Sequence, residues 1–143
     1  MEDATTQRTT RATLAKAHRR FLEQPFVGVV TTLRRDGSPH STVVWVDVLD
    51  GMPSFNTARG RAKERNMGRD PRVSLLVVDP RNVYRWLAVD GRVELSEEGA
   101  DAQIDKLAKK YLGKDRYPGR GPDEVRVSVR ITPERVDAHG FDD

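Results

Sequence analysis

Short runs of alternating apolar and polar residues, separated by tight-turn signals, make up most of the chain. Such alternation is typical of half-buried β-strands. It predicts six strands, at residues 26–33, 39–48, 52–56, 73–78, 82–95 and 125–131. Asp36-Gly37 and Asp50-Gly51 separate the first three. Because Asp-Gly pairs tolerate the positive φ angles of tight hairpin turns, these three strands are expected to form an antiparallel meander.

Three features within the predicted strands refine this picture. Residues 43–46 are Val-Val-Trp-Val, so we expect both faces of that strand to be covered there. Asp90-Gly91 interrupts the longest strand and predicts a β-bulge that bends the sheet. We expect Pro133 to end the last strand, which leaves residues 136–143 as a short tail.

Helical periodicity is confined to three short segments. Apolar residues share one helical face over 11–22 and again over 100–111. Between these, residues 61–67 are mostly good helix formers. We expect Ser96 to cap the third helix and Gly68 to end the second in a left-handed conformation.

Tight turns between most strands favour an antiparallel barrel over a parallel doubly wound sheet, which needs a helical crossover between successive strands. The sequence therefore predicts a mainly β (α+β) fold, a six-stranded antiparallel barrel with short flanking helices. Neither an internal repeat nor a long linker divides the chain, so residues 1–143 are expected to form one domain.

A strand-to-helix transition carries the clearest candidate chemistry. Asn56 and Thr57 can cap a helix or hydrogen-bond an anion, and Arg59, Arg61 and Lys63 follow closely. Backbone N–H groups at a helix start, a hydroxyl and clustered cations together make a phosphate site. A capped surface helix with a solvated basic face explains the same residues equally well when they are taken alone. The phosphate site is favoured because the rest of the chain offers no other chemistry.

Aromatic residues provide further candidates. Trp45 lies in an apolar strand, which favours packing in the core or at a dimer interface. Trp86 shares a predicted strand face with Tyr84, and this pair can either pack in the core or wall a planar ring. The basic loop at 114–122, which includes Tyr117, is either solvated or a clamp for an anionic group.

Several kinds of chemistry are excluded. The chain has no cysteine, so disulfides and thiolate catalysis are ruled out. Its 3 histidines are scattered without metal-ligand spacing, and none has a serine partner in a nucleophile motif. We therefore predict neither a catalytic side chain nor a metal site.

The composition also bears on possible partners. Hydrophobic residues make up 36% and charged residues 33% of the chain, which indicates a lean core or one completed by a partner chain. A net charge of only +3 favours an anionic small molecule over nucleic acid. Since no apolar run reaches the roughly 18 residues of a membrane span and the N-terminus is charged, we expect a cytoplasmic protein.

The order and spacing of several motifs resemble the flavin reductase-like split β-barrel superfamily, which includes pyridoxamine 5′-phosphate oxidase. Within it, the chain is most similar to the PPOX-class enzymes that depend on coenzyme F420. The resemblance extends from residue 26 to residue 136. It rests on the segments 29–40, 43–46, 55–57, 60–66, 70–75, 89–94 and 130–136.

The resemblance implies a homodimer that binds its cofactor in a groove between subunits. In such proteins one group of residues holds the cofactor phosphate and another lies along the ring. The phosphate positions match Thr57, Arg61 and Lys63, with Asn56 as a helper and Arg59 adjacent. The ring positions match Val43, Val44 and Trp45, and Trp86 is expected to reach the ring or substrate from the other subunit.

The activity implied is hydride transfer from reduced F420, a deazaflavin, to a conjugated small molecule. Because the cofactor carries the chemistry, the lack of a catalytic side chain is expected. We favour F420 over FMN because the basic loop at 114–120 suits an anionic tail. The alternatives are an FMN-binding oxidoreductase and a non-catalytic F420 or flavin carrier. A haem protein is disfavoured by the lack of a well-placed axial histidine.

Overall fold

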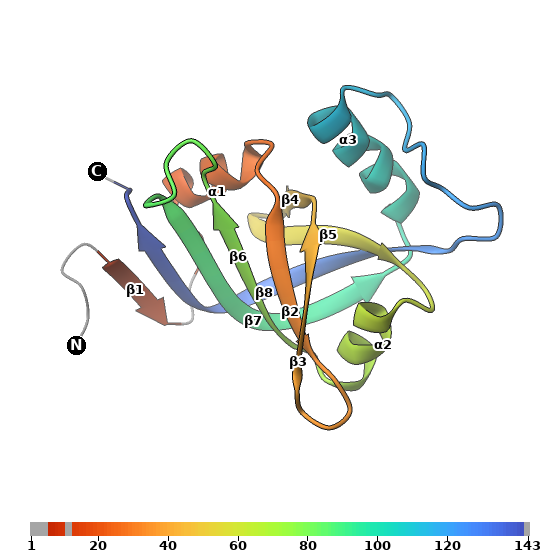
Figure 1. Cartoon of the computed structure of the whole chain (residues 1–143), viewed down its shortest axis with the longest axis horizontal. Coiled ribbons are helices and arrows are strands. Elements are labelled where there is room, and N and C mark those ends of the chain that lie inside the picture. The colour runs from red at the N-terminus through yellow and green to blue at the C-terminus, as the bar shows by residue number, and fades with distance from the viewer. Residues whose placement is uncertain (1–5, 11–12, 142–143) are drawn as a thin grey trace.

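The computed structural model describes residues 6–10 and 13–141, which form one curled antiparallel sheet and three helices (Figure 1). The helices are α1 (Lys16–Glu23), α2 (Ala62–Arg69) and α3 (Ala100–Leu112). The strands are β1 (Thr6–Thr10), β2 (Gly28–Leu33), β3 (Pro39–Val44), β4 (Val46–Leu49), β5 (Met52–Ala58), β6 (Arg72–Val78), β7 (Trp86–Ser96) and β8 (Arg126–His139). The predicted mainly β barrel is confirmed, with eight strands in the described residues instead of six.

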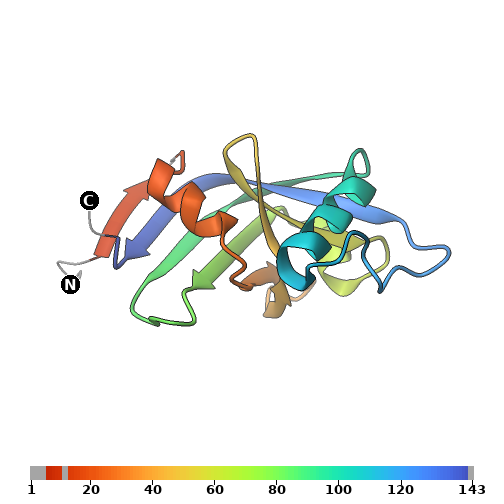
Figure 2. The same ribbon diagram turned by 90° about the horizontal axis from the view of Figure 1, so that it is seen from above.

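The sheet closes on itself at a single residue. Its strand order is β3-β2-β6-β7-β8-β5-β4, with β1 beside β8, so β3 and β4 lie at opposite ends of the order. Only Trp45 separates these two strands in the sequence. The sheet must therefore curl until its two edges meet, which makes a split barrel (Figure 2). The prediction of one continuous strand at 39–48 is wrong because the chain changes edges within it.

The longest strands pair through an irregularity. The register of β7 against β8 shifts between Asp90 and Gly91, which confirms the predicted bulge. Gly91 pairs with Pro133, and β8 continues past it to His139. Proline lacks a ladder donor and is tolerated where a bulge already interrupts the ladder. The prediction that Pro133 ends the strand and begins a tail is therefore wrong.

The core is made by alternate strand residues, whose side chains point into the barrel. The pattern is clear in β2, where Gly28, Val30 and Thr32 are buried, while Val29 is exposed and Thr31 is half-buried. Phe21 of α1 closes one end of the barrel, with its ring centroid 5.3 Å from that of Phe26. The α2 and α3 helices lie towards the opposite end of the long axis (Figures 1 and 2).

The ends of the helices differ from the sequence prediction in two places. Gly99 precedes α3 at φ 74° and is its N-cap, while the Ser96 hydroxyl accepts a hydrogen bond from the Glu98 N–H in the turn before it. Gly68 lies within α2 and has no positive φ. The positive φ in this region belongs to Gly60, at 89°, which turns the chain into α2.

Polar side chains of α3 anchor it where the edge strands meet. The Tyr111 hydroxyl donates to the Phe26 carbonyl at 2.6 Å and accepts from the Val46 N–H at 3.0 Å. The Lys110 ammonium donates to the carbonyls of Leu22 at 2.7 Å and Val46 at 2.6 Å. Burial lowers the pKa of Lys110 to about 8 and raises the pKa of Tyr111 to about 12.

Lys110 predicts a pH dependence of stability. In the unfolded chain its pKa is 10.5, so between pH 8 and 10.5 the unfolded state binds more protons than the folded state and stability rises with pH. Urea unfolding gives the free energy of unfolding of the wild type and of Lys110→Met at each pH. The wild-type value minus the variant value should grow by about 1 kcal/mol from pH 7 to 10, allowing for partial exposure. Exposed Lys109→Met is the control, and a flat or falling difference would contradict burial as the cause.

Candidate functional site

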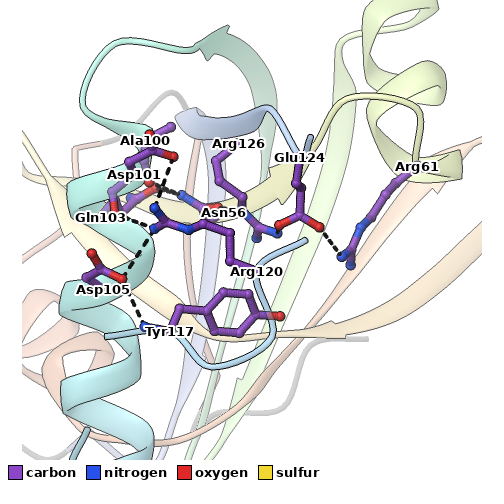
Figure 3. A network of polar contacts seen from close by, with 10 residues as sticks. All are labelled: Asn56, Arg61, Ala100, Asp101, Gln103, Asp105, Tyr117, Arg120, Glu124 and Arg126. Carbon is purple, nitrogen blue, oxygen red and sulfur yellow. Dashed lines mark hydrogen bonds and ion pairs between the residues drawn. The ribbon is translucent and has the colours of Figure 1, made fainter. Parts of the chain in front are cut away.

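A pocket of about 180 Å³ lies beside the junction of β3 and β4, between the start of α2 and one face of α3. The loop between α3 and β8 (residues 113–125, here the α3–β8 loop) borders it (Figure 3). Its lining combines apolar and cationic side chains. They are Val43, Val44, Trp45, Asn56, Arg61, Lys63, Ile104, Leu107, Tyr117 and Arg126.

One wall of the pocket is aromatic and aliphatic. Trp45 stacks on Tyr111 with ring centroids 5.4 Å apart and planes inclined by 7°. The Tyr117 ring meets Trp45 edge-on at 5.9 Å. Since backbone hydrogen bonds hold the Tyr111 hydroxyl, the stack fixes the indole plane at the junction of the edge strands. Val43 stands beside it and is 65% exposed, so the prediction that both faces of 43–46 are covered is wrong for this chain.

The opposite wall is cationic. Arg61 is the N-cap residue of α2 and Lys63 lies in its first turn, where unpaired backbone N–H groups favour anions. Among the described residues Lys63 has neither an ion pair nor a hydrogen bond. Partial burial lowers its pKa, and the charges of Arg61 and Arg126 lower it further. A half-buried, unneutralised ammonium in a pocket is a strong anion-binding feature.

Arg126 is the most buried of these cations. Its side chain is only 3% exposed. It donates to the Asn56 side-chain oxygen at 2.8 Å and to Glu124 at 2.6 Å, and its guanidinium lies 5.2 Å from the centre of the Tyr117 ring. Glu124 also reaches Arg61 at 3.4 Å, so one carboxylate joins β8 to the start of α2 (Figure 3).

The α3–β8 loop is tied back onto α3. The Tyr117 N–H donates to Asp105 at 2.9 Å, and Arg120 pairs with the same carboxylate at 3.3 Å (Figure 3). The sequence suggested a solvated loop or a clamp. The structure places Tyr117 in the pocket lining, while Arg120 is paired to α3.

Six of the nine residues predicted to bind the cofactor come together around this pocket. They are Val43, Val44, Trp45, Asn56, Arg61 and Lys63. Strand alternation places Thr57 on the opposite side of β5 from Asn56, with its hydroxyl buried and without a hydrogen-bond partner. Arg59 turns away to pair with Glu97 at 3.0 Å.

Trp86 lies elsewhere, at the start of β7, where it stacks on His139 with ring centroids 5.9 Å apart. Tyr84 precedes β7 in a turn and is 73% exposed, so the predicted strand face shared by Tyr84 and Trp86 does not exist. Neither residue lines the pocket within this chain.

Sequence reasoning missed three lining residues, Ile104, Leu107 and Arg126. The apolar stripe predicted over residues 100–111 accounts for Ile104 and Leu107 as core residues, whereas the predicted clamp at 114–122 includes Tyr117. Arg126 alternates with valines and was expected on a half-exposed strand face, but α3 and its following loop cover that face. Alternation along one strand carries no information about what covers its polar side.

The residues that line the pocket fit a cofactor with a planar ring and a phosphate group. Apolar walls suit a planar ring, and the adjacent cations suit its anionic group. Across the described residues, no group of three or more His, Cys, Asp or Glu could hold a metal ion. Within the same residues, every helix is too short or too polar to cross a membrane.

A split barrel with such a pocket defines a class of cofactor-binding proteins, and the comparison with known families agrees. Residues 14–140 match the family model described as pyridoxamine 5′-phosphate oxidase, so the chain belongs to this family. The predicted family resemblance is thereby confirmed.

Relatives narrow the comparison. The chain is 31% identical over 118 residues to a protein named F420H(2)-dependent biliverdin reductase from Mycobacterium tuberculosis, covering 81% of each chain. A solved structure named F420 reductase is 31% identical, with a TM-score of 0.72 over 86% of this chain and 98% of that one. A conserved hypothetical protein from M. tuberculosis is 26% identical, with a TM-score of 0.69 over 92% and 89% of the two chains.

Proposed function

We propose that this protein is an F420-dependent oxidoreductase that transfers a hydride from the reduced cofactor to a conjugated small molecule. The observation that carries the proposal is Lys63, a half-buried ammonium without an acidic partner among the described residues, in a pocket walled by Trp45. One relative is named F420H(2)-dependent biliverdin reductase and a solved structure is named F420 reductase; each is 31% identical to this chain, which supports the choice of cofactor and reaction.

The residues of this chain take distinct parts. Lys63 and Arg61 bind the phosphate, and Asn56 orients Arg126 behind them. Trp45 and Val43 form the surface against which the ring lies. When bound, F420 supplies two-electron hydride chemistry, so the chain has only to bind, orient and shield the ring from water.

A homodimer is part of the proposal. Ligand pockets usually span about 300–1,000 Å³, and the pocket of one chain, at about 180 Å³, is smaller. Val43, Val29 and Leu76 lie side by side across β3, β2 and β6 and are 65%, 38% and 40% exposed. A second copy on this apolar row would cover it and enlarge the pocket. The predicted role of Trp86 then requires that second copy.

The choice of cofactor is tested by equilibrium binding of F420 and of FMN to the purified apoprotein. We expect F420 to bind at least about tenfold more tightly, a difference of about 1.4 kcal/mol. The physical reason is that F420 carries an anionic lactyl-glutamate tail besides its phosphate. If FMN bound more tightly than F420, the proposed cofactor would be FMN instead.

Turnover separates an enzyme from a carrier on the same fold. The absorbance of F420 changes when the reduced form is oxidised, so consumption of reduced F420 can be followed with biliverdin, quinones and enones as acceptors. Acceptor-dependent consumption supports the oxidoreductase. Tight F420 binding with no consumption by any acceptor class favours the carrier.

A further inference from the structure

The carboxylate of Glu124 lies outside the pocket lining but contacts two of the cations that form the cationic wall. Its two oxygens lie 2.6 Å from a nitrogen of Arg126 and 3.4 Å from a nitrogen of Arg61 (Figure 3). Lys63, the third cation, has no such partner in the described part of the chain. One carboxylate is thus shared between two guanidinium groups, while the ammonium of Lys63 remains available.

We propose that Glu124 is an intramolecular competitor for the cofactor's phosphate, an autoinhibitory contact that a ligand must displace to bind Arg61 and Arg126. This inference rests on the proposed function, since it concerns the same site. It assigns to the α3–β8 loop a role in controlling cofactor affinity.

Three arguments favour displacement of Glu124 over its coexistence with a bound phosphate. A phosphate and a carboxylate sharing the same pair of guanidinium groups repel each other. Arg126 is 3% exposed and cannot turn to solvent when Glu124 leaves, so an incoming anion has to replace the carboxylate directly. The bond to Arg61 is the longer one, and Arg61 is 46% exposed, so exchange can begin there.

The state of Glu124 fits this role. Burial would raise the pKa of its carboxyl, but the hydrogen bond and charge of Arg126, together with Arg61, outweigh burial and hold the pKa below its usual value. The group is therefore charged at neutral pH. Because Glu124 lies on the same loop as Tyr117, its release would also loosen the cover over Arg126 and Trp45.

The test compares F420 affinity of the whole protein in four forms: wild type, Glu124→Gln, Asp123→Asn and Lys63→Met. Asp123 is the matched control, since it is an exposed carboxylate one residue away on the same loop and, within the described residues, has no ion pair with Arg61 or Arg126. Removing a competitor raises the binding-competent fraction, so Glu124→Gln should tighten F420 binding about five- to tenfold. Asp123→Asn should stay within about twofold because exposed charges are screened.

The outcomes distinguish a failure of this inference from a failure of the proposed function. Unchanged or weaker binding in Glu124→Gln, with Lys63→Met weakened, would overturn the competition and leave the cofactor site standing. Unchanged F420 binding in Lys63→Met would contradict both the proposed cofactor site and the inference that rests on it. If Glu124→Gln does not fold, Glu124→Asp keeps a charge for Arg126 but is one methylene too short to reach Arg61 as well. It should then tighten binding by a smaller factor, and weakened binding would count against the proposal.

Discussion

Replacing both Arg61 and Lys63 by alanine is expected to weaken F420 binding by at least about 100-fold. A hydrogen bond to a charged group contributes roughly 1.5–3 kcal/mol, and this variant removes two of them. Arg126 remains, but a phosphate can bind it only by displacing Glu124, so it cannot fully compensate. Titrating the variant and the wild type with oxidised F420, followed by fluorescence, measures the difference directly.

A matched double variant controls for the lost charge. Arg35→Ala with Arg72→Ala also removes two positive charges, from exposed positions outside the pocket lining. It should change F420 affinity by no more than about threefold, since exposed charges are screened over about 10 Å. Equal losses in the two double variants would mean that general charge, and not this site, attracts the cofactor. Circular dichroism of both variants checks that each is folded.

Turn and bulge signals in the sequence predicted most of the barrel, because the conformation at each of these positions depends on a few neighbouring residues. Asp50-Gly51 makes its turn with φ angles of 52° and 77°, the backbone conformation that an Asp-Gly pair tolerates. The bulge at Asp90 and Gly91 was likewise visible as a turn pair inside an alternating strand. These features depend on a few neighbouring residues, so the rest of the molecule does not override them.

The junction at Trp45 could not be read from the sequence. Residues 39–48 alternate and carry apolar side chains as a single strand would, yet β3 pairs with β2 and β4 pairs with β5. The break arises because the sheet curls until its edges meet, and closure is a property of all seven strands from β3 to β4. The aromatic wall of the pocket lies at this point, so the best-placed site residue is also the one whose position was hardest to predict.

Only the local part of the cationic wall could be predicted from the sequence. Arg61 and Lys63 follow one another at a helix start, so their proximity is local. Arg126 comes from a strand more than sixty positions away and meets them only because β8 pairs with β5. Glu124, whose single carboxylate contacts two of these cations, is fixed by the same pairing. A sequence pattern finds a local cluster but not the carboxylate that tertiary structure brings to it.

Gly91→Ala is expected to destabilise the protein by about 3 kcal/mol, at the upper end of the usual cost of overpacking. A Cβ at this position would lie 2.1 Å from the Thr132 carbonyl oxygen and 3.0 Å from a methyl of Ile131. The closest atom belongs to the backbone, so no side-chain rotation can relieve the clash. The strand would have to move, and β7 and β8 share the longest pairing in the sheet. Urea unfolding of the variant and the wild type measures the loss.

Gly68→Ala is the matched control, because it adds the same methyl group where there is room. Gly68 lies within α2, and the nearest atom to a Cβ there is a Glu64 oxygen at 3.9 Å. Alanine in a helix should therefore stabilise the protein by about 0.5–1 kcal/mol. Opposite signs for the two variants would show that close backbone approach, and not glycine's flexibility, determines the effect at Gly91. If Gly91→Ala were as stable as the wild type, the bulge would have to reform at another residue, and the register from Val93 to Ser96 against β8 would shift with it.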